Sequence, residues 1–158
     1  MGQFNGKFVS AKQDWETPQG LFDVLNERYH FTFDLAASSE NRKCQQFFCE
    51  QDDALGKTWI GVCWLNPPYG DAKSGKLSDW VKKAYMESLK PDCITVMLIP
   101  ARTNTKWWHR YCMKAREVLL VEGRPKFGDA KHGLPQPLAV VVFNGESGET
   151  FFGSLPSR

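Results

Sequence analysis

The residues with the clearest chemical potential stand in one short run, Asn66-Pro67-Pro68-Tyr69. Apolar residues from Ile60 to Leu65 lead into this run, which predicts a buried strand that ends in a stiff turn. The prolines offer no N–H, and the residue before each proline is held extended. The run therefore presents one amide side chain, backbone carbonyl acceptors and one aromatic face. Acceptors aimed at an amino group on a planar ring leave the nitrogen lone pair free to attack an electrophile.

Two further strands are predicted to end in acidic residues. The alternating segment from His30 to Ala37 carries Asp34 next to small residues, and Phe47-Phe48-Cys49 is followed by Asp52 and Asp53. In open α/β sheets, ligands bind at the carboxyl ends of the strands. These acids are therefore expected to face a polar ligand, with backbone close to it where the side chains are small.

The rest of the chain alternates between helical and strand patterns. Thr17 and Pro18 are predicted to begin a helix to Tyr29, with Thr17 as its N-cap. Helices are expected over 77–90 and 106–114, and strands over 93–99, 117–121 and 138–143. The tail after Asn144 is polar and is expected to be peripheral. This alternation is typical of an α/β fold.

Composition excludes several classes of protein. The chain has 158 residues, 42% hydrophobic and 24% charged, which fits one globular domain. It holds no run of 18 apolar residues and no signal-peptide pattern at Met1, so a membrane span and export are not expected. Five cysteines at irregular spacing favour reduced thiols in a cytoplasm, and no metal site is expected.

Charge is distributed unevenly along the chain. Residues 1–60 carry 6 Lys/Arg against 9 Asp/Glu, whereas residues 61–158 carry 14 against 9, for a total of +2. Within 102–132, basic residues alternate with Trp107, Trp108 and Tyr111. Basic residues among aromatic ones are typical of a nucleic-acid surface, although Trp108 and Tyr111 are expected to be core residues.

Six blocks in a consistent order give the chain a family resemblance. They are Trp15-Glu16-Thr17-Pro18, Phe33-Asp34-Leu35-Ala36-Ala37, Asp52-Asp53-Ala54-Leu55, the Asn66–Tyr69 run, Leu98-Ile99-Pro100-Ala101 and Gly123-Arg124-Pro125-Lys126-Phe127. With these blocks the chain resembles the phage and prophage Dam-type DNA N6-adenine methyltransferases. The resemblance implies a compact, trimmed Rossmann-like methyltransferase fold of the α/β class, with a central, mostly parallel sheet flanked by helices. It also implies methyl transfer from S-adenosylmethionine to the exocyclic N6 of a flipped-out adenine in DNA.

The resemblance also implies roles for individual residues. The expected catalytic residues are Asn66, Pro67, Pro68 and Tyr69. The expected cofactor-binding residues are Trp15, Thr17, Pro18, Asp34, Ala36, Asp53 and Asn66. The expected substrate-binding residues are Tyr69, Arg102, Arg124, Lys126 and Phe127, with Phe127 as a second aromatic face for the base.

The expected organisation is an N-terminal arm over residues 1–13 and a single methyltransferase domain over 14–158. Loops at 70–76 and 123–137 are expected to contact DNA, since no second domain of DNA-reading size is evident. The expected assembly is a monomer or weak homodimer in the cytoplasm of a bacterial host, with phage or prophage origin.

Several alternatives stay open. Cytosine N4, RNA-base and protein-glutamine methyltransferases use a similar four-residue run to bind the amino group of their substrates. Outside these enzymes, the rival is an inactive methyltransferase fold that binds DNA.

Overall fold

A central sheet runs through the computed structural model, which describes residues 16–70, 72–128, 135–145 and 148–156. The strands of this part of the chain are β1 (Phe33–Asp34), β2 (Gln46–Phe47), β3 (Gly61–Leu65), β4 (Cys93–Pro100), β5 (Glu117–Glu122), β6 (Leu138–Phe143) and β7 (Phe151–Pro156). Their order is β2-β1-β3-β4-β6-β5-β7. Only β6 pairs antiparallel with its neighbours, β4 and β5. The predicted α/β class with a mostly parallel sheet is therefore confirmed.

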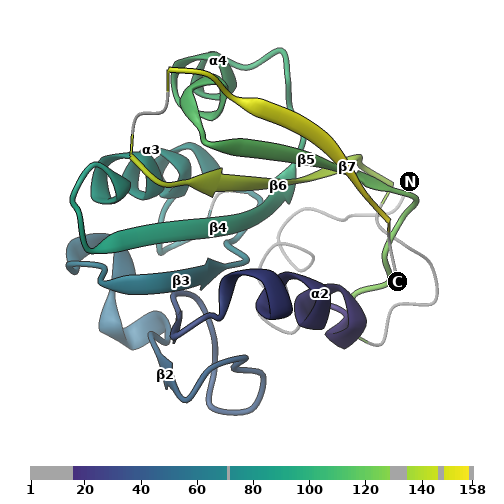
Figure 1. Cartoon of the computed structure of the whole chain (residues 1–158). Helices are drawn as coiled ribbons and strands as arrows, with labels where there is room; N and C mark the ends of the chain where they lie inside the picture. Colours follow the sequence, from purple (N-terminus) through teal and green to yellow (C-terminus); the bar gives the residue numbers. More distant parts are fainter. Residues whose placement is uncertain (1–15, 71, 129–134, 146–147, 157–158) are drawn as a thin grey trace, which may run out of the picture.

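Helices cover both faces of this sheet (Figure 1). The described α-helices are α2 (Gln19–Tyr29), α3 (Leu77–Ser88) and α4 (Lys106–Arg110). Helices α3 and α4 lie on one face, and α2 lies on the other. None of the described helices is long and apolar enough to cross a membrane. Between β1 and β3 the chain forms only β2 and two short 3-10 turns, Glu50–Asp52 and Ala54–Gly56, so this strand–helix unit is trimmed as predicted.

The two faces of the sheet bury separate apolar clusters. Along β4, Met97 and Ile99 pack toward α3, while Val96 and Leu98 pack toward α2. This alternation follows from the two-residue period of a strand and explains why β4 is apolar throughout. Strand β3, which carries the Asn66–Tyr69 run, is fixed by this double-sided core, with Leu65 fully buried at its end.

One carboxylate fastens α2 to the far half of the sheet. Glu117 at the start of β5 accepts a hydrogen bond from Arg28 at 2.6 Å and from the Tyr29 hydroxyl at 2.8 Å. Both donors lie in the last turn of α2. Because Glu117 is mostly buried, this contact fixes the helix that leads away from Thr17.

The predicted N-cap at Thr17 is wrong. Helix α2 begins at Gln19, Pro18 precedes it in an extended conformation, and no side chain caps it. The Pro18 carbonyl accepts from the Phe22 N–H at 3.1 Å instead. The Thr17 hydroxyl accepts a hydrogen bond from Asn66, which is distant in sequence, so the local capping pattern predicted the wrong partner.

The tail also differs from the prediction. Residues Phe151–Pro156 form β7, which pairs with β5 in parallel and extends the sheet. Its side chains Phe151 and Phe152 are 60% and 50% exposed, and only Leu155 is buried. An edge strand has one backbone partner and little packing, so a short polar tail with two phenylalanines gave no clear pattern of alternation.

Gly61 provides a test of how β3 begins. Its φ angle is +94°, and a Cβ there would lie 2.5 Å from Thr32 Oγ1, which itself accepts from the Val62 N–H. We expect Gly61→Ala to lower the free energy of unfolding by at least about 2 kcal/mol through strain and collision. Gly148→Ala is the control, since its φ is +73° with nothing within 4 Å of the added atom. Urea denaturation of both variants tests this. Equal losses of unfolding free energy would show that the structure relieves the collision between the added Cβ and Thr32.

Candidate active site

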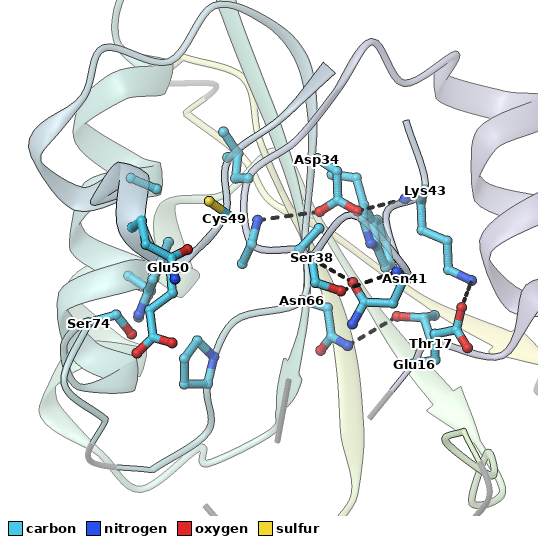
Figure 2. Close-up of a pocket in the computed structure, with 18 of the residues that line it drawn as sticks. Glu16, Thr17, Asp34, Ser38, Asn41, Lys43, Cys49, Glu50, Asn66 and Ser74 are labelled. Atoms are coloured by element: carbon cyan, nitrogen blue, oxygen red, sulfur yellow. Dashed lines mark hydrogen bonds and ion pairs between the residues drawn. The ribbon is translucent and has the colours of Figure 1, made fainter. Parts of the chain in front are cut away.

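A cavity of about 210 Å³ opens at the carboxyl ends of β1 and β3 (Figure 2). Its walls come from the segment before α2, the ends of β1 and β3, the loop after β1 and the turns before β3. The cavity is lined by five of the predicted cofactor residues and one of the predicted catalytic prolines, which are Thr17, Asp34, Ala36, Asp53, Asn66 and Pro68. The binding roles of these residues stay predictions.

The Asn66 amide lies at the edge of this cavity between two hydroxyls. Its Nδ2 donates to Thr17 Oγ1 at 3.1 Å, and its Oδ1 accepts from the Tyr69 hydroxyl at 2.7 Å. The Tyr69 hydroxyl also lies 3.1 Å from the Leu98 carbonyl oxygen. An amide oxygen has two lone pairs, so the contact with Tyr69 does not exhaust its capacity as an acceptor.

The Tyr69 side chain is held in place by contacts with the protein interior. Its ring packs partly against the α2-side core, and burial raises the pKa of its hydroxyl well above the ordinary value. The group therefore stays protonated and serves as a hydrogen-bond donor at neutral pH. Neither Tyr69 nor Pro67 is among the residues that line the cavity.

Asp34 sits at the end of β1 and organises the loop that follows it. Its side chain is 3% exposed, and its carboxylate accepts from the backbone N–H of Lys43 at 2.9 Å and of Ala36 at 3.3 Å. Burial raises the pKa of Asp34 to about 6, and these two hydrogen bonds partly oppose that shift. A carboxylate of this kind would become more fully ionised beside a bound cation.

The two neighbouring acids Asp52 and Asp53 have different positions. Asp52 accepts from the Cys49 N–H at 2.8 Å and stabilises the turn, whereas Asp53 lines the cavity. Asp53 also has a left-handed backbone, with φ of +54°, which is uncommon outside glycine and often marks functional turns. The structure thus favours Asp53 over Asp52 as the residue that faces a ligand.

Sequence reasoning missed Lys43, which lies at the end of the cavity near Thr17 (Figure 2). Its side chain is only 8% exposed, and its Nζ lies 2.9 Å from Gln19 Oε1 and 3.7 Å from Glu16 Oε1. A lysine in a polar loop carries no signal of burial in the sequence. Its burial follows from the fold of the loop around Asp34.

The cavity is acidic overall and contains one unusual donor. Among the described residues, its charged lining consists of the carboxylates Glu16, Asp34, Glu50 and Asp53 and the ammonium of Lys43. Trp80, which also lines it, has the one buried side-chain N–H that lacks a hydrogen-bond partner within the described residues. Buried donors are rarely left unpaired, so a bound molecule with an acceptor is expected here.

Apart from Tyr69, the predicted substrate residues lie on the segments after β4 and β5. Arg124 and Lys126 are exposed, and Arg102 is half-buried with its guanidinium 3.4 Å from Gln136 Oε1. The Gly128 N–H donates to the Glu16 carbonyl at 2.9 Å, which brings this loop beside the Thr17 segment. Trp15 and residues 129–134 of the predicted 123–137 loop lie outside the described residues.

Phe127 does not occupy the predicted position. Its side chain is 2% exposed and packs in the α2-side core with Trp64 and Leu98. It therefore presents no face to a ligand, and the predicted stacking on a base is not supported. Alternation explains this outcome, because Pro125 and Phe127 point inward and Arg124 and Lys126 outward. Trp108 is buried, as predicted from its helix pattern.

Sheet order, helices on both faces and a polar cavity at the strand ends together define a compact Rossmann-like methyltransferase fold. The model of the family described as DNA N-6-adenine-methyltransferase (Dam) matches residues 6–141. The chain therefore belongs to this Dam family.

Individual relatives agree with this assignment. A DNA N-6-adenine-methyltransferase of Escherichia phage T1 is 34% identical over 112 residues, which is 68% of this chain and 44% of the relative. One of Haemophilus phage HP1 is 29% identical over 115 residues, 71% of this chain and 64% of the relative. A putative methyltransferase YfdM of Escherichia coli K12 is 32% identical over 63 residues, 35% of this chain and 69% of the relative. The chain thus spans about half to two thirds of the two phage proteins.

The raised pKa of Asp34 predicts a pH effect on stability. Because the folded pKa of about 6 exceeds the ordinary 3.8, Asp34 favours folding most at acid pH. This contribution is lost as the pH rises through about 6. The unfolding free energy of the wild type relative to Asp34→Asn should therefore fall by roughly 2 kcal/mol between about pH 4 and 7. Urea denaturation across this range measures it, and a constant difference would contradict the burial of an ionisable group.

Proposed function

We propose that this protein is a DNA adenine methyltransferase that uses S-adenosylmethionine to methylate the exocyclic N6 of a flipped-out adenine. The observation that carries the proposal is the Asn66 amide, held between Thr17 and Tyr69 at the edge of a polar cavity. Membership of the Dam family supports the choice of adenine and DNA. The phage relatives are named for the same activity.

The residues around the cavity fit the proposed cofactor. S-adenosylmethionine carries a sulfonium and an ammonium, and the four carboxylates and one lysine that the described residues place around the cavity suit a cationic ligand. Its own carboxylate, ribose hydroxyls and ring nitrogens would supply acceptors for Lys43, the Thr17 hydroxyl and the Trp80 N–H. Asp53 and Glu50 are the candidates to accept from the ribose and the adenine amino group of the cofactor.

The proposed mechanism depends on acceptors and alignment. When bound, the cofactor supplies a methyl carbon bonded to a positively charged sulfur. The Asn66 side-chain oxygen and the Pro67 carbonyl would accept hydrogen bonds from the N6 amino group of the target adenine, which keeps the nitrogen lone pair directed at that carbon. The amino group becomes acidic only after methylation, so solvent can take its proton and no strong base is required.

The DNA would be held by exposed basic side chains outside the cavity, on the segments that follow β4 and β5. Arg124 and Lys126 are exposed on a loop tied to Glu16, and Lys106, Arg110 and Lys114 are exposed on and after α4. Contacts of this kind bind phosphates and position the duplex without reading bases. The target base must leave the stack, because an adenine inside a duplex cannot reach the cavity.

Incubation with labelled S-adenosylmethionine and unmethylated DNA tests the proposal. Label recovered as N6-methyladenine supports it. Label in N4-methylcytosine or only in RNA favours one of the rival amine methyltransferases. DNA binding with no transfer of label favours an inactive fold and rejects the proposal.

We expect Asn66→Ala to abolish methyl transfer and to leave cofactor affinity within about threefold of the wild type, because its proposed role lies at the base. Asn144→Ala is the control, since Asn144 does not line the cavity. Transfer rates and calorimetric titration with the cofactor measure the two effects. Wild-type turnover in Asn66→Ala would reject the role.

We expect Arg124→Ala to weaken DNA binding and to reduce the slope of log affinity against log salt by about one, the value for one lost phosphate contact. Lys57→Ala is a matched control, because Lys57 is exposed in the acidic half of the chain. Fluorescence anisotropy at several salt concentrations gives both slopes. An unchanged slope in Arg124→Ala would place this residue away from the DNA.

A further inference from the structure

We propose that Thr17 is a positioning residue that couples the methyl donor to the orientation of the Asn66 amide. This inference rests on the proposed function and adds a link between its two binding sites. When the Thr17 hydroxyl donates its hydrogen bond to the bound S-adenosylmethionine, it can only accept a hydrogen bond from Asn66. The Asn66 oxygen is then the end of the amide available to the target amine.

Thr17 is built into the site rather than into the helix beside it. Its side chain is 4% exposed, lines the cavity and does not cap α2. Its Oγ1 lies 3.1 Å from Asn66 Nδ2, across 49 positions of sequence (Figure 2). The preceding residue is fixed as well, because the Glu16 carbonyl accepts from the Gly128 N–H. The hydroxyl therefore borders the cavity and contacts the amide at the same time.

An asparagine amide has two ends with opposite properties, and only one of them suits this reaction. The oxygen can accept from an incoming amine, whereas the NH2 would meet the hydrogens of that amine with hydrogens of its own. Hydroxyl groups can donate or accept hydrogen bonds. The hydroxyls of Thr17 and Tyr69 could therefore also bond to an Asn66 amide turned by 180°. In that arrangement Thr17 would donate to the amide oxygen, and Tyr69 would accept from the NH2 while donating to the Leu98 carbonyl, which lies 3.1 Å away.

The direction of the Thr17 O–H bond favours one of the two arrangements. Among the described residues, no acceptor receives a hydrogen bond from this hydroxyl, and the residue borders the cavity. An acceptor of the bound S-adenosylmethionine, such as a carboxylate oxygen, would accept a hydrogen bond from this hydroxyl. Thr17 would then be an acceptor only, and the reversed amide would lose its partner. A ligand shifts the balance between two states only by binding them differently. Here the two states are the two orientations of the Asn66 amide, and S-adenosylmethionine would favour the one in which Thr17 is an acceptor.

Three variants test the proposal under single-turnover conditions at saturating S-adenosylmethionine, with DNA from a methylation-deficient host. Thr17→Val keeps the shape and removes the hydroxyl, so we expect transfer to slow by about tenfold or more, which corresponds to about 1.4 kcal/mol. Thr17→Ser keeps the hydroxyl and should stay within about threefold of the wild type. Thr95→Val controls for the loss of a buried hydroxyl, because Thr95 is fully buried in β4 and does not line the cavity.

A second readout does not depend on turnover. The side-chain NH2 signals of Asn66, identified by their loss in Asn66→Asp, report exchange of these protons with solvent. We expect S-adenosylmethionine to slow this exchange in the wild type and in Thr17→Ser, but not in Thr17→Val. This spectroscopic arm decides the role of Thr17 even if the wild type forms no N6-methyladenine, an outcome that would reject the proposed function alone.

The proposal is overturned by any of three results. Transfer by Thr17→Val within about threefold of the wild type would show that Asn66 needs no help. A Thr17→Ser variant as slow as Thr17→Val would show that the hydroxyl is not the cause. Exchange of the Asn66 amide protons that does not respond to S-adenosylmethionine in the wild type would show that the two sites are not coupled.

Discussion

The site depends on one hydrogen-bonded amide at the end of one strand. Asn66 is held extended before two prolines, and its side chain is fixed by Thr17 on one side and Tyr69 on the other. An amide that could rotate freely would present donors as often as acceptors to an incoming amine. The orientation of the Asn66 amide therefore depends on its hydrogen-bond partners, which come from segments far apart in the sequence.

The sheet supplies the rigidity that this arrangement needs. Strand β3 lies between β1 and β4 and is packed on both faces, so the turn at its end has little freedom. Helix α2 is anchored through Glu117 at the opposite half of the sheet, and this keeps the Thr17 segment close to the turn. The trimmed region between β1 and β3 still provides two of the segments that line the cavity, with Asp34 ordering one loop and Asp52 ordering the other.

Much of this arrangement could be predicted from local patterns. The apolar run into Asn66, the strand that ends at Asp34 and the strand over 138–143 each have a clear period or a clear stop, and the structure places these elements as expected. What failed depended on tertiary contacts. Thr17 has the residue type of an N-cap but bonds to Asn66, Phe127 follows a basic residue but points into the core, and Lys43 is buried without any pattern that indicates it.

The site formed by Asn66 and the neighbouring cavity is proposed to methylate an adenine amino group in DNA. Sequencing of modified bases in DNA from a methylation-deficient bacterial host that expresses this chain tests it most directly. N6-methyladenine is expected at one recurring short sequence, and none is expected in cells without the protein. Genomic DNA with unmodified adenines despite soluble, folded protein, or with methyl groups on cytosine instead, would contradict it.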